Sequence, residues 1–436
     1  MRNIKFLTIC IILVGVLFCL FNTSCTQNSA SVGEKSQSKE KGAEFSETST
    51  STNLQIAAAQ QLIEKNSNAP NGYNALAIAY IHMARETGDF SLNSKAETAV
   101  NRALEIESAN YDAQRIKASL LLTFHRFQEA LEFGAQLQKE HPQDPIVYGV
   151  LTDANVELGN YKEAADAVQK MVDLHPNMES YARVSYVRYF YGDSDGAIDA
   201  MKTAAKIADP ADKEAQAWCL VHLGDELFKV GRYDEAEKVY DQSLKIFPDY
   251  HFGLAAKGKV RAAAGDYENA AKFYTQAQER VPLTLTDIAL GDIYTKLGKP
   301  DEAQKQYDLA EFIEQKFGNI DQRTLALLWA DHDIKLDEAL QLATAEHEKR
   351  KDILTADIYA WCLYKKGQFE EAKKVITEAM RMKTKDARIF YHAGMIEKEL
   401  GNKKAAVDYL QRAIKLNPAF DILQIETAKA TLQELK

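Results

Sequence analysis

The chain has 436 residues, of which 46% are hydrophobic and 27% are charged, and its formal net charge at pH 7 is −10. These proportions are ordinary for a soluble globular protein. The acidic balance excludes the basic surface that nucleic-acid binding requires, and it argues against adsorption to anionic lipid by charge alone. We therefore expect no nucleic-acid partner.

The first 25 residues predict an export signal. Arg2 and Lys5 precede sixteen mostly apolar residues, 6–21, a stretch that is short for a membrane-spanning helix and suits the core of a signal peptide. The next four residues, Asn22-Thr23-Ser24-Cys25, resemble the cleavage site of a bacterial lipoprotein, although Asn22 stands where leucine is usual. We expect a lipid anchor at Cys25 and a location in the bacterial cell envelope, on the periplasmic or surface side. The alternatives are an uncleaved anchor or an ordinary signal peptide of a secreted protein.

The next segment, residues 26–53, is rich in Ser, Thr, Glu and Lys and predicts a disordered tether, because it cannot bury enough apolar surface to become ordered. Residues 54–70 follow the pattern of a lone helix that ends near Pro70. We expect this helix to cap the repeats that come after it. Residues 421–436 predict a second capping helix at the other end.

Between the caps the chain repeats one unit, seen most clearly at residues 217–250. Leucines recur there every three or four residues, which places them on one face of a helix. Gly231 ends this helix, because glycine tolerates the left-handed conformation at a helix end, and a second helix runs from there to Pro248. Neither helix can bury its apolar stripe alone, so the unit predicts a stack of helix pairs.

An alanine near the start of the second helix sets the register of these units. Consecutive alanines lie 33 to 39 residues apart, at Ala96, Ala130, Ala164, Ala197, Ala236, Ala270, Ala303, Ala339, Ala372 and Ala406. Seven of them follow a glycine by five residues: Gly159, Gly192, Gly231, Gly265, Gly298, Gly367 and Gly401. The longest step, from Ala197 to Ala236, predicts a joint at residues 208–212 that divides the repeats into halves at 71–210 and 211–420.

This pattern resembles the tetratricopeptide repeat family, whose 34-residue unit carries W-x2-L-G-x2-Y and then Ala, an aromatic residue, Ala and Pro. The resemblance implies an all-α, right-handed solenoid of about ten helix–turn–helix repeats. Residues 181–201, 217–237 and 389–406 also resemble a group of secreted or lipid-anchored bacterial repeat proteins without an assigned activity. The family register places small residues where the two helices of a unit cross closely, pairing Gly224 with Ala236, Gly258 with Ala270, Gly291 with Ala303, and Gly394 with Ala406.

The sequence carries no catalytic signature. HExxH, G-x-S-x-G, a Walker loop and paired CxxC motifs are all absent. The one acid–histidine cluster, Asp331-His332-Asp333, is better explained as a solvated turn than as a metal site. Cys219 and Cys362 are expected to be small buried residues. We therefore expect a non-enzymatic protein without a cofactor, a metal or a small-molecule substrate.

The resemblance also implies where a protein partner binds, because the first helices of such repeats line a concave face that takes extended peptides or helices. Asp153, Asp225 and Asp292 on this face would favour a partner segment of mixed apolar and basic residues. Two alternatives are a structural subunit of an envelope complex that uses its convex face, and an enzyme or ligand-binding protein with a site inside the superhelix. The inward positions predicted to form the groove are Tyr186, Tyr189, Phe190, Trp218, Asp225, Phe228, Trp361 and Tyr364.

Overall fold

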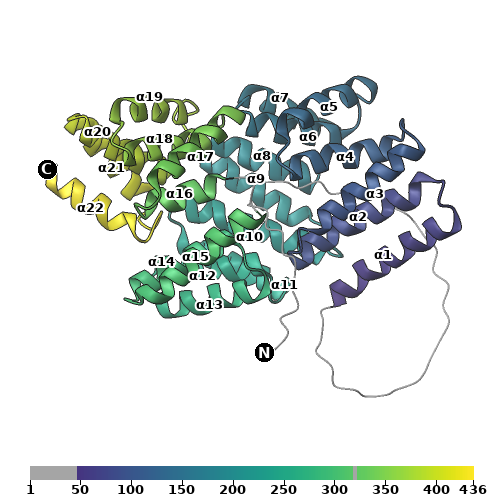
Figure 1. Cartoon of the computed structure of the whole chain (residues 1–436), viewed down its shortest axis with the longest axis horizontal. Coiled ribbons are helices and arrows are strands. Elements are labelled where there is room, and N and C mark those ends of the chain that lie inside the picture. The colour runs from purple at the N-terminus through teal and green to yellow at the C-terminus, as the bar shows by residue number, and fades with distance from the viewer. Residues whose placement is uncertain (1–46, 318–321) are drawn as a thin grey trace, which may run out of the picture.

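The computed structural model describes residues 47–317 and 322–436, and all of the regular secondary structure in these ranges is helical (Figure 1). The predicted export signal and Cys25 lie outside them. Within the described ranges, none of the helices combines the length and the apolar character that a membrane crossing requires. The prediction of an all-α fold is confirmed.

Ten helical hairpins follow one another through the described residues, between a lone first helix, α1 (Glu47–Lys65), and a lone last helix, α22 (Gln424–Glu434). The hairpins are α2 (Pro70–Thr87) with α3 (Leu92–Ile106), α4 (Tyr111–Thr123) with α5 (Phe127–Glu140), α6 (Pro145–Glu157) with α7 (Tyr161–Leu174), α8 (Met178–Phe190) with α9 (Ser194–Ile207), α10 (Lys213–Lys229) with α11 (Tyr233–Ile246), α12 (His251–Ala263) with α13 (Tyr267–Arg280), α14 (Thr284–Lys296) with α15 (Pro300–Phe317), α16 (Arg323–Asp331) with α17 (Leu336–Lys349), α18 (Ile353–Lys365) with α19 (Phe369–Ala379), and α20 (Ala387–Glu399) with α21 (Lys403–Leu416).

The N-terminal cap differs from its prediction. Helix α1 begins at Glu47, inside the segment predicted to be a disordered tether, and it ends at Lys65. Its early residues pack on the next helix, because Thr52 is buried and its hydroxyl donates to Glu86 of α2 at 2.9 Å. Pro70 is the first residue of α2 and does not close α1, which fits the tolerance of a helix start for proline.

Buried alanines hold the two helices of each hairpin together. All ten register alanines lie on second helices, and each is at most 3% exposed. The paired glycines lie on the first helices, but the side chain over each glycine comes one turn after the alanine of its pair. Tyr240 covers Gly224 in this way, and a Cβ at Gly258 would lie 2.8 Å from the ring of Tyr274. Tyr307 covers Gly291 and Leu410 covers Gly394.

The turn between the two helices of a hairpin contains a residue in the left-handed backbone conformation. All seven predicted glycines have φ between 69° and 78°. Where a repeat lacks the glycine, another residue takes the strained conformation: His125 has φ 54°, and Asp333 and Lys335 have φ 55° and 44° in the repeat of Ala339. Such a backbone conformation is uncommon for residues other than glycine.

The predicted joint at residues 208–212 does not divide the hydrophobic core. Ile198 and Ala204, which precede it, belong to the same cluster of buried side chains as Ala215 and Leu223, which follow it. The five extra residues therefore lengthen a connection without separating two halves.

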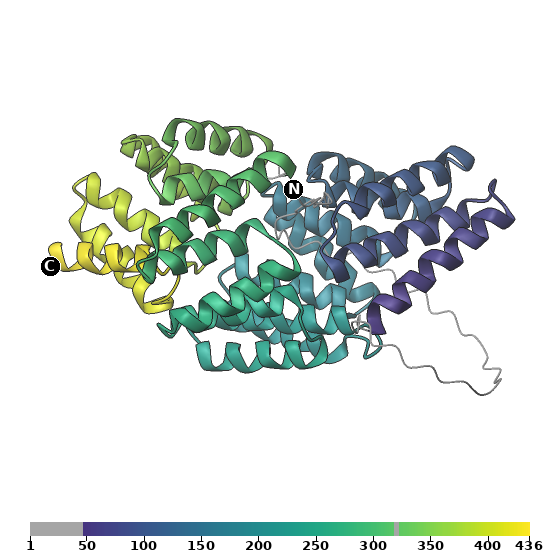
Figure 2. The same ribbon diagram turned by 60° about the horizontal axis from the view of Figure 1, so that its bottom comes forward.

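The superhelix closes on itself, so that later repeats contact earlier ones (Figures 1 and 2). Among the hydrogen bonds between distant repeats, five pairs that are 186 to 197 residues apart in sequence join α7, α8, α10 and α11 to the starts of α18 and α20 and to the end of α21. We call this contact the inter-turn seam. It consists of Tyr161 with Ile353, Phe190 with Thr384, Tyr189 with Asp386, Phe228 with Asn417, and Tyr233 with Ala419.

The surroundings of the turn glycines show the same closure. A Cβ added at Gly159, Gly192 or Gly231 would lie within 3.2 Å of the backbone of residues 351, 383 and 416, respectively. At Gly265, Gly298, Gly367 and Gly401 an added Cβ would meet nothing within 4 Å. The first set therefore lies under a later part of the chain, and the second set lies on an open surface.

Candidate functional site

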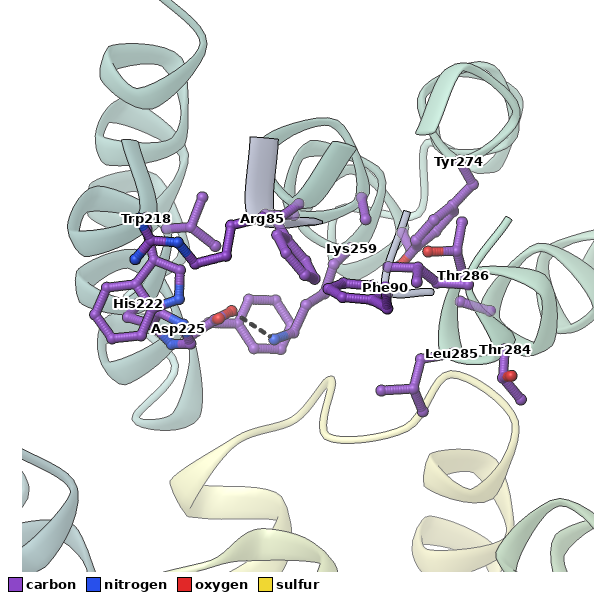
Figure 3. Close-up of a pocket in the computed structure, with 18 of the residues that line it drawn as sticks. Arg85, Phe90, Trp218, His222, Asp225, Lys259, Tyr274, Thr284, Leu285 and Thr286 are labelled. Carbon is purple, nitrogen blue, oxygen red and sulfur yellow. Dashed lines mark hydrogen bonds and ion pairs between the residues drawn. The ribbon is translucent and has the colours of Figure 1, made fainter. Parts of the chain in front are cut away.

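The interior of the superhelix contains a cavity of about 610 Å³. Its walls come from the first helices α2, α4, α10, α12 and α14, and residues 419–422, between α21 and α22, close one side (Figure 3). Phe90, in the connection from α2 to α3, closes another side and packs with Val281 and Leu283 at the end of α13. Repeats from both ends of the chain thus enclose one space.

The cavity wall is mainly apolar. Aromatic side chains reach it from five places: Phe90 from the α2–α3 connection, Trp218 and Phe228 from α10, Phe252 from α12, Tyr274 from α13, and Phe420 from the C-terminal segment. Leu285, at the start of α14, also lines the cavity and is 46% exposed. Such a surface suits an apolar ligand of limited size, because small-molecule sites in proteins span roughly 300–1,000 Å³.

One pair of opposite charges on the wall is held by α2 and α10. Arg85 Nε lies 3.7 Å from Glu214 Oε2, and the hydroxyl of Tyr250 donates to Glu214 Oε1 at 2.9 Å. Burial raises the pKa of Glu214, although Arg85 opposes the shift. This carboxyl group is therefore occupied by partners within the protein.

A second charged pair joins α10 to α12. Lys259 Nζ lies 2.9 Å from Asp225, and the hydroxyl of Tyr240 donates to the same carboxylate at 2.9 Å. Burial alone would raise the pKa of Asp225, but Lys259 and His222 outweigh burial and hold it below its usual value. The ring of His222 packs against that of Trp218 at a tilt of 53°, with ring centroids 4.0 Å apart, and burial lowers the pKa of His222 to about 4. At neutral pH the imidazole is therefore uncharged.

The acid–histidine cluster after α16 is not the solvated turn that we predicted. His332 lies 3.3 Å from Asp292, which also lines the cavity and accepts a hydrogen bond from Tyr307. Asp331 accepts a hydrogen bond from Trp361 Nε1 at 2.8 Å, and burial raises its pKa to about 6. Of the three residues only Asp333 is exposed, because Trp361 of a later repeat covers Asp331 and Tyr307 of the preceding repeat packs against His332.

The structure separates the eight predicted groove residues into two groups. Trp218, Asp225 and Phe228 line the cavity. The prediction that the others face an open groove is wrong, because Tyr186, Tyr189, Phe190 and Trp361 are buried and Tyr364 is half-buried, stacked on Trp361. Tyr189 donates to Asp386 at 2.7 Å within the inter-turn seam, so a distant repeat contacts a side chain that we predicted to face a partner.

The expectation of a basic partner also fails. Asp153 is 2% exposed and lies 2.6 Å from Arg183, which is equally buried. Asp225 and Asp292 have cationic or histidine partners of their own within the protein. The concave face therefore presents no group of unpaired acids to a ligand.

Sequence reasoning missed Arg85, Phe90, Lys259 and the segment 419–422, all of which line the cavity. One signal was available for Phe90, because the turn between the first predicted helix pair is longer than the others. The remaining residues meet only through the closure of the superhelix.

Metal binding and thiol chemistry are the remaining possibilities for a functional site. Across residues 47–317 and 322–436, no three or more His, Cys, Asp or Glu side chains are grouped so as to hold a metal ion. Cys219 and Cys362 are buried and unpaired with each other, which confirms their predicted role as small core residues.

Comparison with known families identifies the class. Models of the tetratricopeptide repeat match residues 83–145, 222–283, 288–311 and 387–420. Together with the repeated hairpins, these matches show that the chain carries tetratricopeptide repeats in these segments. Its fold is the all-α solenoid of that family.

Individual relatives are distant. A TPR repeat-containing protein of Methanocaldococcus jannaschii is 22% identical over 405 residues, which are 86% of this chain and 68% of the relative. Subunit 3 of the anaphase-promoting complex of Schizosaccharomyces pombe is 22% identical over 314 residues, 69% of this chain and 45% of that protein. Among solved structures, the human IFIT1 dimer with PPP-AAAA is similar with a TM-score of 0.46 and 14% identity, over 84% of this chain and 88% of that chain.

Proposed function

We propose that this protein is an interaction scaffold that binds an apolar segment of a partner protein in the interior cavity. Tetratricopeptide repeat proteins commonly act as non-enzymatic scaffolds for other proteins. The observation that carries the proposal is the cavity of about 610 Å³ on the concave side, with aromatic side chains on several walls.

The chemistry of the wall supports an uncharged segment. Aromatic side chains supply large contact areas at low cost in conformational entropy, which is why they often dominate binding energies. The charged pairs Arg85–Glu214 and Lys259–Asp225 are satisfied within the protein. We therefore expect the affinity for the partner to depend weakly on salt, since screening acts mainly on exposed and unpaired charges.

Two substitutions separate binding from packing. Trp218→Ala removes a half-buried ring from the cavity wall, whereas Tyr189→Ala removes a buried ring from the inter-turn seam. Recovery of partner proteins from a membrane extract, followed by crosslinking and mass spectrometry, should fail with Trp218→Ala while its melting temperature stays close to that of the wild type. Tyr189→Ala should instead lower the melting temperature. Normal partner recovery by Trp218→Ala, and equally by Phe252→Ala, would remove the cavity as the binding site.

We also propose that the protein is exported and anchored by lipid at Cys25, on the strength of the apolar stretch at residues 6–21 and the Asn22–Cys25 sequence. Mass spectrometry of the mature N-terminus should find an acylated Cys25. Cys25→Ala should leave the chain unprocessed or released from the membrane. A mature wild-type protein without acyl mass would overturn the anchor and leave the secreted alternative.

A further inference from the structure

We propose that the interior cavity binds a small amphipathic carboxylate, an apolar chain with one ionised carboxyl group, and that the carboxylate lies at the N-terminus of α14. The proposal shares its cavity with the proposed function but does not depend on it, because the ligand is a free small molecule. If both hold, the small molecule and the partner segment compete for one space.

The start of α14 offers hydrogen-bond donors to the cavity. Leu283 occupies the N-cap position and has no side-chain oxygen to accept from the first turn. The first backbone hydrogen bond of the helix runs from Asp287 N to Leu283 O at 3.0 Å, so the N–H groups of residues 284–286 have no partner within the helix. These residues line the cavity. A helix N-terminus with free N–H groups carries partial positive charge and favours a bound anion.

A buried hydroxyl beside these donors gives a second indication. Thr284 is 1% exposed and lines the cavity, and its Oγ1 has no hydrogen-bond partner. An unpartnered buried polar group is destabilising. A ligand oxygen placed at the helix start would supply the missing partner. Figure 3 shows Thr284, Leu285 and Thr286 together on the side of the cavity away from Trp218.

The rest of the cavity suits the apolar chain of such a ligand. Leu285 lies in the first turn of α14, Phe90 and Trp218 lie further along the wall (Figure 3), and Phe252 also lines the cavity. A chain that extends from the α14 terminus past these rings would bury most of its apolar surface, which favours binding.

The acidic groups near the site are partly satisfied within the protein, and Asp287 Oδ2 is buried without a hydrogen-bond partner. Asp287, in the first turn of α14, accepts a hydrogen bond from Gln278 of α13 at 2.7 Å, and burial raises its pKa to about 7. Asp292 lies beside His332, and Asp421 caps α22 by accepting from the backbone N–H groups of Leu423 and Gln424. The cations Lys259 and Arg388 also line the cavity, but Lys259 pairs with Asp225 and Arg388 lies 3.8 Å from Asp357. A carboxylate at the start of α14 therefore depends on the free N–H groups of the helix and on the Thr284 hydroxyl.

Titration calorimetry on the purified full chain tests the proposal with three probes of equal chain length: dodecanoate, dodecanol and dodecylammonium, each below its micellar concentration. We expect dodecanoate to bind about tenfold more tightly than dodecanol, as for one hydrogen-bonded charge, and dodecylammonium to bind least. Equal affinity for dodecanoate and dodecanol would overturn the placement of the carboxylate. An absence of dodecanoate binding would overturn the whole proposal.

Two variants at one exposed position locate the carboxylate. Leu285→Asp puts a fixed negative charge in the first turn of α14. Leu285→Asn introduces a side chain of nearly the same shape as aspartate but without the charge. Both should keep the wild-type melting temperature, because residue 285 lies at the surface of the cavity and is 46% exposed. Leu285→Asp should weaken dodecanoate binding about tenfold relative to Leu285→Asn and leave dodecanol unchanged. Equal dodecanoate affinity in the two variants would contradict the proposed site.

The outcomes separate this inference from the proposed function. Failure of dodecanoate to bind, together with loss of the partner in Trp218→Ala, leaves the scaffold and removes the small ligand. Binding of dodecanoate without any effect of Trp218→Ala on partner recovery leaves the small ligand and removes the cavity as the binding site of the partner protein. Displacement of a recovered partner by dodecanoate, and not by dodecylammonium, would support both.

Discussion

Tyr240 shows how one side chain connects the packing of a hairpin to the cavity. Its ring covers Gly224 on the facing helix, so closely that any side chain at position 224 would collide with it. Its hydroxyl donates to Asp225, which also binds Lys259 of the next hairpin. The ring is fully buried. The close crossing of α10 and α11 therefore also fixes a carboxylate on the cavity wall.

We predict that Gly224→Ala lowers the free energy of unfolding by about 1–3 kcal/mol, because the added methyl group overpacks the contact with Tyr240. Helix propensity predicts the opposite sign, since alanine in a helix interior is favoured over glycine by about 1 kcal/mol. Denaturant unfolding monitored by circular dichroism measures the difference. A variant more stable than the wild type would show that the helices do not cross as closely as described.

Residue patterns of this kind are local, and for that reason the sequence predicts them well. The turn glycines and the register alanines act within one hairpin of about 34 residues, so their spacing alone indicates their role. The aromatic residues at inward positions are different. Tyr189 and Trp218 both lie on first helices at positions predicted to face the groove, but Tyr189 is buried against a distant repeat and Trp218 lines the cavity. Their own hairpins cannot distinguish these outcomes.

At the scale of elements, the starts of the first helices carry the contacts between repeats. Asp386 caps α20 by accepting from the backbone N–H groups of Arg388 and Ile389 at 2.8 and 3.1 Å. It also accepts from the hydroxyl of Tyr189 in α8 at 2.7 Å. Burial alone would raise the pKa of Asp386, but Arg388 and the Tyr189 hydroxyl hold it below its usual value. One carboxylate thus caps the start of α20 and joins two turns of the superhelix.

We predict that Asp386→Ala lowers the free energy of unfolding by about 2–4 kcal/mol. Loss of an N-cap costs about 0.5–2 kcal/mol, and the Tyr189 hydroxyl, left buried without an acceptor, adds about 1–3 kcal/mol. The matched control is Asp266→Ala, which removes the cap of α13 at a turn with no inter-turn contact. Thermal and denaturant unfolding should show a loss of only about 1 kcal/mol for the control. Equal losses in both variants would mean that Asp386 acts as a cap and nothing more.

At the scale of the molecule, the inter-turn seam changes how the repeats depend on one another. In an open solenoid each repeat contacts only its neighbours, and stability is close to a sum of local terms. Here the carbonyl groups at the ends of two first helices, Phe190 O and Phe228 O, accept from Thr384 and Asn417, which are 194 and 189 residues away in sequence. The side chains of remote repeats therefore complete the hydrogen bonding of α8 and α10.

The sequence does not predict this closure, because the pitch of a superhelix accumulates from small rotations at every repeat. The hairpin pattern fixes the number and order of helices. It does not fix whether residue 384 reaches residue 190. The cavity depends on the same closure, since Phe90 and Phe420 approach from opposite ends of the chain to line it. Its position therefore follows from the pitch and not from a motif.

The seam predicts an effect of mutation at long range. Thr384→Ala removes the hydroxyl that donates to Phe190 O at 2.5 Å and leaves that buried carbonyl without its partner. We expect amide hydrogen exchange, followed by mass spectrometry, to become about tenfold faster at the C-terminal turn of α8, as for a loss near 1.4 kcal/mol in local stability.

Thr377→Ala is the matched control, because the hydroxyl of Thr377 bonds only to Lys373 O within α19 and is exposed. It should change exchange in α19 alone. If Thr384→Ala likewise changed exchange only near residue 384, the two turns would not be in contact in solution and the cavity would be open on that side. Faster exchange in both α8 and the residues around 384, with α12 and α13 unaffected, is the pattern that the closed superhelix requires, since those two helices lie outside the seam.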